Sequence, residues 1–167
     1  MKSKSELNAQ GFTLIELIVV ITLISIMLFF AVPKFGSQFL IDESKAAARW
    51  IMINVPALKA RAVRDHKLYA LQISFSRNKF WIINETMSEE EQVLAEEKGY
   101  DLPEGIRIID VEYPGDQKIT SGLADIYFYA AGYSDKALIH LGNNKGEELF
   151  FHIEPFLSKI KYSRNAL

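Results

Sequence analysis

A single carboxylate, Glu16, lies inside a long apolar segment, and its position requires a chemical explanation. Between Phe12 and Val32 there are 21 residues, and Glu16 is the one charged residue among them. An acidic side chain at the centre of a membrane helix is unfavourable by about 2.5–3.5 kcal/mol on insertion scales. Glu16 lies near the start of the segment, where this cost is lower. The carboxylate either pairs with a cationic group or extends toward polar headgroups.

The three histidines are not predicted to form a catalytic or metal site. His140 and His152 fall on one predicted hairpin, where His140 is expected opposite Leu149, and His66 follows a predicted helix. Because a zinc site needs a third convergent ligand, these histidines are interpreted as surface or edge residues. The sequence contains no Gly-x-Ser-x-Gly, P-loop or Gly-x-Gly-x-x-Gly motif. We therefore predict no enzyme activity, no metal and no cofactor.

The apolar segment has the length of a membrane helix. At a rise of 1.5 Å per residue, a helix of this length spans roughly 30 Å, the thickness of the bilayer hydrocarbon. Residues 1–11 are polar and include Lys2 and Lys4, which favours a cytoplasmic N-terminus. An ordinary secretory signal, cut after Ala31, is the weaker alternative, because Phe29 stands where such signals have a small residue.

Composition limits the remaining classes. The 167 residues are 49% hydrophobic and 24% charged, with a net charge of −2. The residues outside the apolar segment are numerous enough to form one domain with its own core. The charge and the lack of a basic stripe with interleaved aromatic residues indicate no nucleic-acid partner. There is no cysteine, so the domain depends on packing rather than disulfides.

Residues 34 to 65 are predicted to continue the helix, because apolar residues recur every three or four positions. Pro33 is expected to kink the helix where the apolar segment ends, and Pro56 marks either a second kink or a boundary between two helices. The predicted apolar stripe consists of Phe35, Phe39, Ala46, Trp50, Ile53, Ala57, Ala60 and Val63. The same helix carries a basic face that consists of Arg49, Lys59, Arg61 and Arg64. This face is interpreted as solvated or, less favourably, as packed against a neighbouring subunit.

After the helix, the sequence alternates as antiparallel strands do. Strands are predicted at 69–75, 80–83, 105–113, 125–130, 137–141, 147–153 and 160–162, with Gly, Pro and Asn turns between them. Ser88 and Glu91 have capping-box spacing for an acidic helix over 88–98, which Gly99 ends. This helix is interpreted as solvated, because no Asp-rich calcium loop is present. The predicted fold class is α+β, a long, partly transmembrane helix packed on an antiparallel β-sheet domain.

The segment Gly11-Phe12-Thr13-Leu14-Ile15-Glu16 resembles the class III signal of type IV pilins and type II secretion pseudopilins. It has glycine before the cut, an aromatic residue after it, and glutamate as the fifth mature residue, and Pro33 ends the apolar segment as in pilin-like helices. The resemblance implies that a prepilin peptidase cuts between Gly11 and Phe12 and methylates the Phe12 amine. It also implies that Glu16 pairs with the Phe12 amine of a neighbouring subunit, which removes much of the cost of a bare carboxylate in lipid.

The C-terminal half is similar in layout to minor pseudopilins of the H class and to related minor pilins. Its hairpins open with Phe-Tyr-Ala-Ala-Gly-Tyr-Ser at 128–134 and close with Ile-Glu-Pro-Phe-Leu-Ser-Lys-Ile-Lys at 153–161. The Glu-rich helix at 88–98 departs from the common H-class pattern.

Together these resemblances imply a structural subunit, a minor pseudopilin of a type II secretion pseudopilus that helps to export folded proteins across the outer membrane. Residues 1–11 are then a leader, 12–33 a transmembrane and filament-core helix, and 34–167 a periplasmic pilin-like domain whose helix continues to about 65. The expected partners are other pseudopilins or pilins, the prepilin peptidase and the inner-membrane assembly platform. The expected location is the bacterial inner membrane, crossed once with the N-terminus cytoplasmic, and then a periplasmic filament.

Three alternatives stay open. The first is a minor pilin of a type IV pilus. The second is a membrane-anchored periplasmic enzyme or ligand-binding domain with a fortuitous leader. The third, a single-pass sensor, is disfavoured because 11 residues precede the apolar segment.

The proposed pairing of Glu16 sets the axial register of a subunit, because a misregistered subunit leaves two charges unpaired. We expect Glu16→Ala or Glu16→Leu to insert into the membrane normally but to enter filaments poorly. Fractionation of membranes and sheared filaments measures both steps. Assembly of either variant at the wild-type level would show that the register role is wrong.

Overall fold

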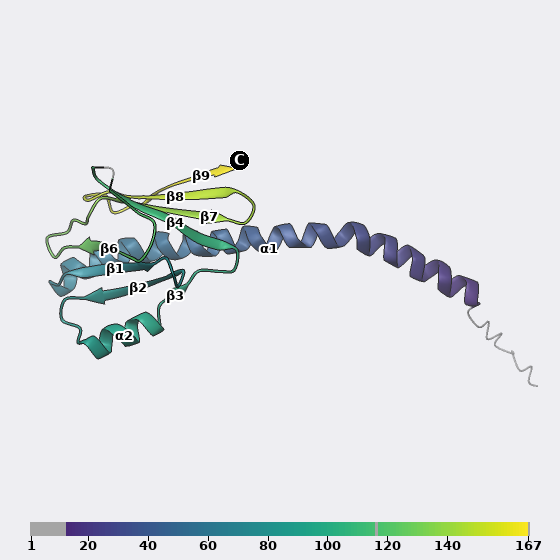
Figure 1. The fold of residues 1–167 in the computed structure, drawn as a ribbon, viewed down its shortest axis with the longest axis horizontal. Coiled ribbons are helices and arrows are strands. Elements are labelled where there is room, and N and C mark those ends of the chain that lie inside the picture. The colour runs from purple at the N-terminus through teal and green to yellow at the C-terminus, as the bar shows by residue number, and fades with distance from the viewer. Residues whose placement is uncertain (1–12, 116, 167) are drawn as a thin grey trace, which may run out of the picture. The chain divides into compact units, whose positions relative to one another are not determined.

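The computed structural model describes residues 13–115 and 117–166, with side chains for 13–28, 43–115 and 117–165 (Figure 1). The chain divides into two compact units, Met1–Phe39 and Leu40–Leu167. Helix α1, Leu14–Asp65, contributes to both. It is continuous through Pro56, so the alternative of two separate helices is wrong. At Pro33 the backbone is also helical, but the side chain lies outside those described, and the kink stays a prediction.

The second unit contains two antiparallel sheets, which confirms the α+β prediction. Sheet one has the order β3-β2-β1-β6, and sheet two has the order β5-β4-β7-β8-β9 (Figure 1). The strands are β1 Tyr69–Ser74, β2 Lys79–Asn84, β3 Tyr100–Asp101, β4 Ile106–Tyr113, β5 Gln117–Ile119, β6 Leu123–Phe128, β7 Ala137–Asn143, β8 Glu147–Ile153 and β9 Lys161–Ala166. The two strands missed by sequence analysis, β3 and β5, have two and three residues, too few to show an alternating pattern.

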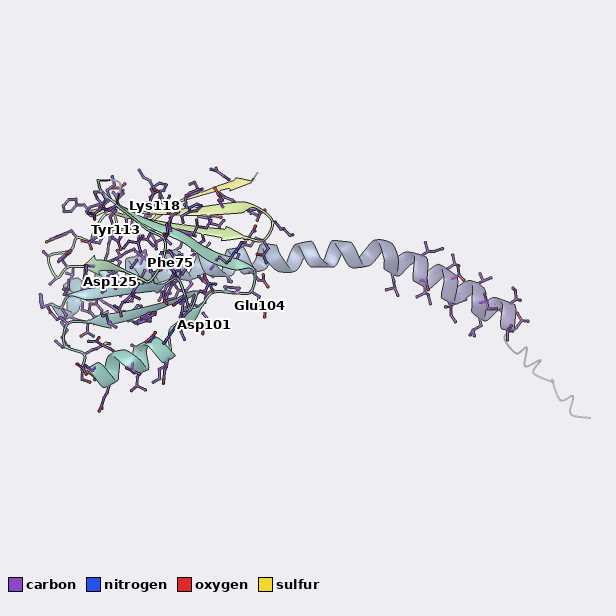
Figure 2. All side chains as sticks on the ribbon, in the orientation of Figure 1. Phe75, Asp101, Glu104, Tyr113, Lys118 and Asp125 are labelled. Carbon is purple, nitrogen blue, oxygen red and sulfur yellow. The ribbon has the colours of Figure 1, made fainter. Side chains whose placement is uncertain are left out.

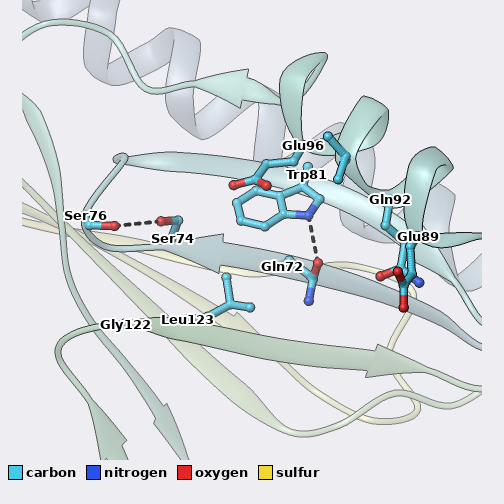
Figure 3. A pocket seen from close by; sticks show the side chains of 10 residues that line it. Gln72, Ser74, Ser76, Trp81, Glu89, Gln92, Glu96, Gly122 and Leu123 are labelled. Carbon is cyan, nitrogen blue, oxygen red and sulfur yellow. Dashed lines mark hydrogen bonds between the residues drawn. The ribbon is translucent and has the colours of Figure 1, made fainter.

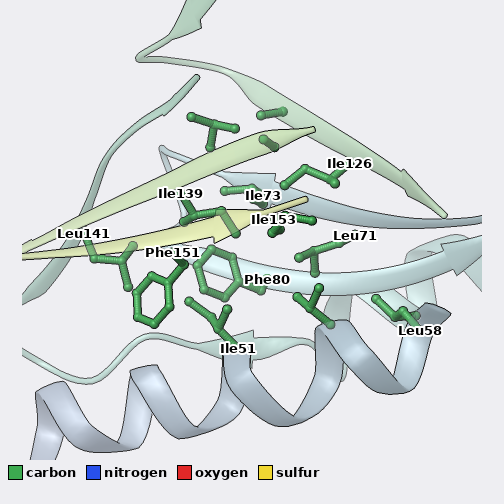
Figure 4. Close-up of a cluster of buried hydrophobic side chains, with 14 of the residues drawn as sticks. Ile51, Leu58, Leu71, Ile73, Phe80, Ile126, Ile139, Leu141, Phe151 and Ile153 are labelled. Carbon is green, nitrogen blue, oxygen red and sulfur yellow. The ribbon is translucent and has the colours of Figure 1, made fainter. Parts of the chain in front are cut away.

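The core forms between α1 and the inward faces of both sheets (Figure 4). From α1 it takes one stripe of side chains at helical spacing, Ala47, Ile51, Val55, Leu58 and Ala62. From the strands it takes alternate residues, and the largest fully buried side chains there include Leu71, Ile73, Phe80, Ile126, Phe128, Ile139, Leu141 and Phe151.

The buried stripe of α1 differs from the apolar stripe on which the helix prediction was based. Ile53 and Val63 belong to the apolar stripe of the sequence pattern but are exposed, and Trp50 is only half-buried. The helix is apolar on two neighbouring stripes, and a step of one residue turns a helix by about 100°. Periodicity alone does not separate two such stripes. The inward faces of the sheets select the stripe that is buried.

Helix α2, Glu89–Glu97, has the predicted capping box, in which Glu91 N donates to Ser88 Oγ and Ser88 N donates to Glu91 Oε2. The helix lies beside β2 (Figure 1) and has no buried residue. Polar contacts attach it instead, because Arg77 pairs with Glu96 and the Lys79 ammonium donates to the Glu97 carbonyl at 3.0 Å.

Gly99 follows α2 for a steric reason rather than for a left-handed turn. A Cβ there would lie 2.7 Å from the Phe80 carbonyl oxygen. The glycine therefore lets the chain pass close to β2 directly after the helix ends.

The β7–β8 hairpin differs by one residue from the register predicted for it. His140 lies opposite Phe150, not Leu149. Residues 144–146 form a three-residue loop between the strands, and Gly146 at its end has a φ of 77°. A glycine at this position is typical of three-residue hairpin loops, which set a different register from two-residue loops.

The outer edge of β6 is covered by side chains from sheet two and its connection. The Tyr113 hydroxyl donates to the Asp125 carbonyl at 2.7 Å (both labelled in Figure 2). Asp135 makes two hydrogen bonds with the backbone of Tyr127. The Asp135 carboxylate accepts from Tyr127 N at 3.0 Å, and Asp135 N donates to the Tyr127 carbonyl at 2.9 Å. Burial, followed by the nearby Asp125 and Asp135 charges, raises the pKa of Tyr113 to about 12. The hydroxyl therefore remains a donor at physiological pH, and this strand edge is closed to pairing with another chain.

Two phenylalanines near the end of β8 provide a matched test of this core. Phe151 is fully buried, whereas Phe156 is 84% exposed. We expect Phe151→Ala to lower the free energy of unfolding by about 3–5 kcal/mol, because it leaves a cavity. Phe156→Ala should change it by less than about 0.5 kcal/mol. Urea unfolding of both variants measures the difference, and equal losses would contradict the assignment of the core.

Candidate functional site

Helix α1 begins with a polar cap formed by Thr13 and by Glu16, a residue of the predicted site. Thr13 precedes the helix, and its hydroxyl accepts from Glu16 N at 3.3 Å, while its carbonyl accepts from Leu17 N at 3.2 Å. Thr13 is thus the N-cap and Glu16 the third helical residue. A carboxylate in the first turn is stabilised by the positive end of the helix dipole. Glu16 therefore has a local structural role in addition to any role in assembly.

The described side chains of the first unit are all exposed and nearly all apolar. Figure 2 shows them projecting from every side of the helix between 13 and 28. Two polar side chains in this stretch are satisfied within the helix, since Thr22 Oγ1 donates to the Ile18 carbonyl at 2.7 Å and Ser25 Oγ to the Ile21 carbonyl at 2.8 Å. The surface therefore offers apolar contact in all directions with no hydroxyl in need of a partner.

The other residues of the predicted site lie outside what the structure describes. Gly11 and Phe12 are not among the described residues, and the side chain of Pro33 is not described. Over the described residues, no helix combines the length and the apolar character required to cross a membrane.

His140 contradicts its interpretation as a surface or edge histidine. It lies on the central strand β7, where Nδ1 is 3.0 Å from Asp110 Oδ2 and the ring stacks on Phe150 with a centroid distance of 4.3 Å. Lys118 Nζ approaches the same Asp110 oxygen at 3.1 Å, and His140 Nε2 lies 3.7 Å from Glu148. A β-bulge at Ile108–Asp110 turns Asp110 toward the outer face, where it meets His140.

This cluster joins β4 to β7 through the Asp110 carboxylate, which contacts both His140 and Lys118. Asp110 Oδ1 and His140 Nε2 have no hydrogen-bond partner within the described residues, and no serine, threonine or cysteine in that part of the chain hydrogen-bonds to the histidine. In the same residues, no group of three or more His, Asp and Glu side chains is placed to hold a metal ion. What the network does is fix β4 to β7 on the outer face of sheet two.

A hollow of about 570 Å³ lies between α2 and the outward face of sheet one, and we call it the α2 hollow (Figure 3). Trp81 and Leu123 supply its apolar lining from the strands, and Val93 supplies it from α2. The indole Nε1 of Trp81 donates to Gln72 Oε1 at 2.7 Å, so the ring is fixed in position (Figure 3). Glu89 and Glu96 also line it, and Glu96 pairs with Arg77 beside the hollow.

The connection between β8 and β9, residues 154–160, is held by one ammonium group from α1, and we call it the Phe156 loop. Lys59 Nζ donates to three backbone carbonyls, those of Glu154, Pro155 and Leu157. Burial lowers the pKa of Lys59, and the nearby Glu154 carboxylate partly offsets that effect. Lys59 is therefore not a solvated member of the basic face, as the sequence suggested.

The Phe156 loop displays apolar side chains to solvent. Phe156 and Leu157 are exposed, and Tyr133 lies against Phe156 with a ring distance of 6.1 Å. Tyr133 also stacks on Tyr129 at 4.5 Å, and Ser134 N donates to the Pro155 carbonyl. Two connections and the end of α1 thus form one ordered, partly aromatic surface.

Comparison with known proteins supports the N-terminal and the C-terminal resemblances separately. Residues 7–32 match the family model of the prokaryotic N-terminal methylation motif. This match includes Gly11, Phe12 and Glu16, and it confirms that the N-terminus is of the prepilin type. No curated protein sequence matches the chain.

Two solved structures of the minor pseudopilin EpsH from the type 2 secretion system of Vibrio cholerae are similar to this chain. One is 11% identical, with a TM-score of 0.50, and the match covers 68% of this chain and 96% of that one. The other is 13% identical, with a TM-score of 0.46, and covers 68% and 95%. The first likeness shows that the chain has the fold of a minor pseudopilin. With the N-terminal motif, it confirms the resemblance to pilin-like proteins and, at the level of the fold, to a minor pseudopilin.

Two features of these surfaces, the Thr13 cap and the Lys59 contacts, were not predicted from the sequence. The Thr13-x-x-Glu16 spacing is that of a capping box, so the start of α1 could have been predicted from the sequence. The role of Lys59 could not be predicted from the sequence, because its three acceptors are backbone carbonyls almost a hundred residues away. No local pattern indicates such a contact.

Lys59→Met tests the anchoring of the Phe156 loop. The substitution keeps most of the aliphatic stem but removes the donor to three carbonyls, so we expect a loss of about 1–3 kcal/mol in the free energy of unfolding. Amide hydrogen exchange should also become faster across 154–160. Lys159→Met, at an exposed position, is the matched control, and the loop is held by other contacts if the two variants behave alike.

Proposed function

We propose that this protein is a structural subunit of a pilin-like filament, in the role of a minor pseudopilin of a type II secretion system. In that role it helps to export folded proteins across the outer membrane and performs no catalysis itself. Its partners are other pseudopilins, the prepilin peptidase and the inner-membrane assembly platform. The chain is anchored in the inner membrane with its C-terminal domain in the periplasm before it enters the filament.

The observation that carries this proposal is the chemistry of the helix at 13–28. Every described side chain there is exposed, and Glu16 is the one charged group. A soluble monomer gains nothing from such a surface, because each exposed apolar group is unfavourable in water. The surface suits two apolar surroundings, lipid before assembly and neighbouring helices after it. The match of residues 7–32 to the methylation motif supports this proposal, in which the helix lies first in lipid and then among neighbouring helices.

Processing supplies the partner for the carboxylate. Cleavage between Gly11 and Phe12 creates an α-amine at Phe12, four residues before Glu16. In an apolar filament interior, an ammonium and a carboxylate on neighbouring subunits attract strongly, and each removes the cost of burying the other. The helix dipole at Thr13 stabilises Glu16 while the subunit is still alone.

The test is the intact mass and N-terminal sequence of the full-length protein, extracted from membranes with and without an active prepilin peptidase. We expect a chain that begins at N-methylated Phe12 only when the peptidase is active. An inactive peptidase variant, expressed at the same level, is the control.

Two results would overturn the proposal. A chain that still begins at Met1 in the presence of active peptidase would show that the motif is not processed. A chain cut after Ala31 in both cases would show an ordinary secretory signal and remove the filament helix altogether.

A further inference from the structure

Helix α2 is attached to sheet one with little burial of apolar surface. None of its residues is buried, and its largest apolar side chains, Val93 and Leu94, are 56% and 48% exposed. The half-buried residues of the helix are Gln92, Ala95 and Glu96, which lie on one face at helical spacing. The more covered face of α2 is therefore mostly polar, and hydrophobic packing contributes little to its attachment.

Two polar contacts join α2 to sheet one among the residues that the structure describes. Arg77, in the turn between β1 and β2, pairs with Glu96, and Lys79 Nζ donates to the Glu97 carbonyl at 3.0 Å. The Arg77 side chain is 64% exposed, so dissolved ions reach the pair. An exposed ion pair stabilises a fold only weakly, and salt screens it. The attachment of α2 therefore depends on a contact that ionic strength weakens.

The same two cations also stabilise the helix itself. Helix α2 has nine residues, and a helix shorter than about 12–15 residues is marginal in water. Its last turn contains Glu96 and Glu97 and no basic residue, which is unfavourable at the negative end of the helix dipole. Arg77 and Lys79 supply the missing positive charge from sheet one. Because the helix needs these contacts, its detachment and its unfolding are expected to be one event.

The chain on both sides of α2 is fixed independently of the helix. Before it, Thr86 Oγ1 accepts from Lys67 Nζ at 2.9 Å. After it, Tyr100 pairs with Phe80 in the β2–β3 ladder. Residues 88–99 can therefore leave the sheet while both flanking segments stay in place. Such a segment is a local unfolding unit with a lower stability than the domain as a whole.

Detachment of α2 would change the surface beneath it. Trp81 lines two hollows that border different faces of the helix, and it is 6% exposed while α2 is in place (Figure 3). The α2 hollow is bordered by Val93, and a second hollow of about 320 Å³ is bordered by Ala95. Trp50 lines the second hollow and stacks on Tyr100 with a centroid distance of 4.9 Å. Because Trp81 is common to both hollows, removal of α2 joins them.

We propose that α2 is a salt-sensitive flap on sheet one. It leaves the sheet as a unit when the Arg77–Glu96 pair is screened or removed, and its departure joins the two hollows into one surface that contains both tryptophans of the chain. At low ionic strength the pair holds the flap closed. The inference goes beyond the proposed function and does not rest on it, because every contact involved lies within the second unit.

Amide hydrogen exchange of the full-length protein in a nonionic detergent, at about 20 and about 500 mM sodium chloride, tests the flap. The amides of 92–98 report on α2, since Gln92 N donates to the Ser88 carbonyl and Lys98 N to the Leu94 carbonyl. Strand β1, which lies between β2 and β6, is the internal reference. At low salt we expect the α2 amides to exchange at least about 100-fold faster than those of β1. High salt should accelerate the α2 amides several-fold further and leave β1 unchanged.

Arg77→Gln removes the ion pair and tests whether it is the latch. At low salt this variant should show the fast α2 exchange that the unmodified protein shows at high salt, and added salt should then have no further effect. Arg107→Gln, at an exposed arginine on β4, is the matched control and should behave like the unmodified protein. Because both arginines are exposed, both variants keep their fold, which thermal unfolding verifies.

A thiol on the more covered face of α2 gives a second readout. The chain has no cysteine, so Ala95→Cys introduces the one thiol present. Its reaction with a maleimide should become several-fold faster at high salt. Ser163→Cys, at an exposed serine on β9, corrects for the effect of salt on the reaction itself.

Three outcomes would overturn the inference. Exchange of the α2 amides as slow as that of β1 would show that α2 does not open separately. Equal acceleration of α2 and β1 by salt would show that salt acts on the whole domain. Identical exchange in Arg77→Gln and Arg107→Gln would show that the Arg77–Glu96 pair is not the latch. None of these outcomes bears on processing at Phe12, so the proposed function is tested separately.

Discussion

The second unit depends on one interaction, the packing of a single stripe of α1 against two sheets at once. The stripe is made of small and medium-sized residues, Ala47, Ile51, Val55, Leu58 and Ala62, which allow strands to approach the helix closely. The larger buried side chains, such as Phe80 and Phe151, come from the sheets. Without the helix, neither sheet has a second layer against which to bury its inward face. The rest of the unit, including both connections around Phe156, is positioned by this contact.

Much of this arrangement follows from local sequence patterns. The strands of five residues or more, the capping box at Ser88 and Glu91, and the end of α1 before His66 were all predicted from alternation and from turn and cap residues. These features arise from interactions within a few residues. The choice between the two apolar stripes of α1, by contrast, is made by residues far away in the sequence. The hydrogen bond of Asp110 with His140 and the anchoring of the Phe156 loop by Lys59 also join distant residues. Such contacts leave no periodic signal.

Polar groups act in this structure mainly to fix edges and connections. Tyr113 and Asp135 occupy the backbone groups along the free edge of β6, and Lys59 occupies the carbonyls of the Phe156 loop. The candidate site divides in the same way. Its N-terminal part was recognisable because a motif of six adjacent residues carries it. The surface around Phe156 was not recognisable from the sequence, because it is formed by residues of α1 and of two separate connections that come together only on folding.

The internal hydrogen bonds of Thr22 and Ser25 have a consequence for the energy source of assembly. Their hydroxyls are already satisfied by the Ile18 and Ile21 carbonyls, so in the proposed assembly the transfer of the helix from lipid to protein neighbours would exchange one nonpolar surrounding for another. Such a partition between two similar phases has a small free-energy change per residue. Beyond the proposed pairing of Glu16, the apolar part of the driving force for such an assembly would then arise from the water-exposed domain, where apolar surface can still be removed from water. Growth of the proposed filament would consequently weaken on cooling, as a process driven by the burial of apolar surface does.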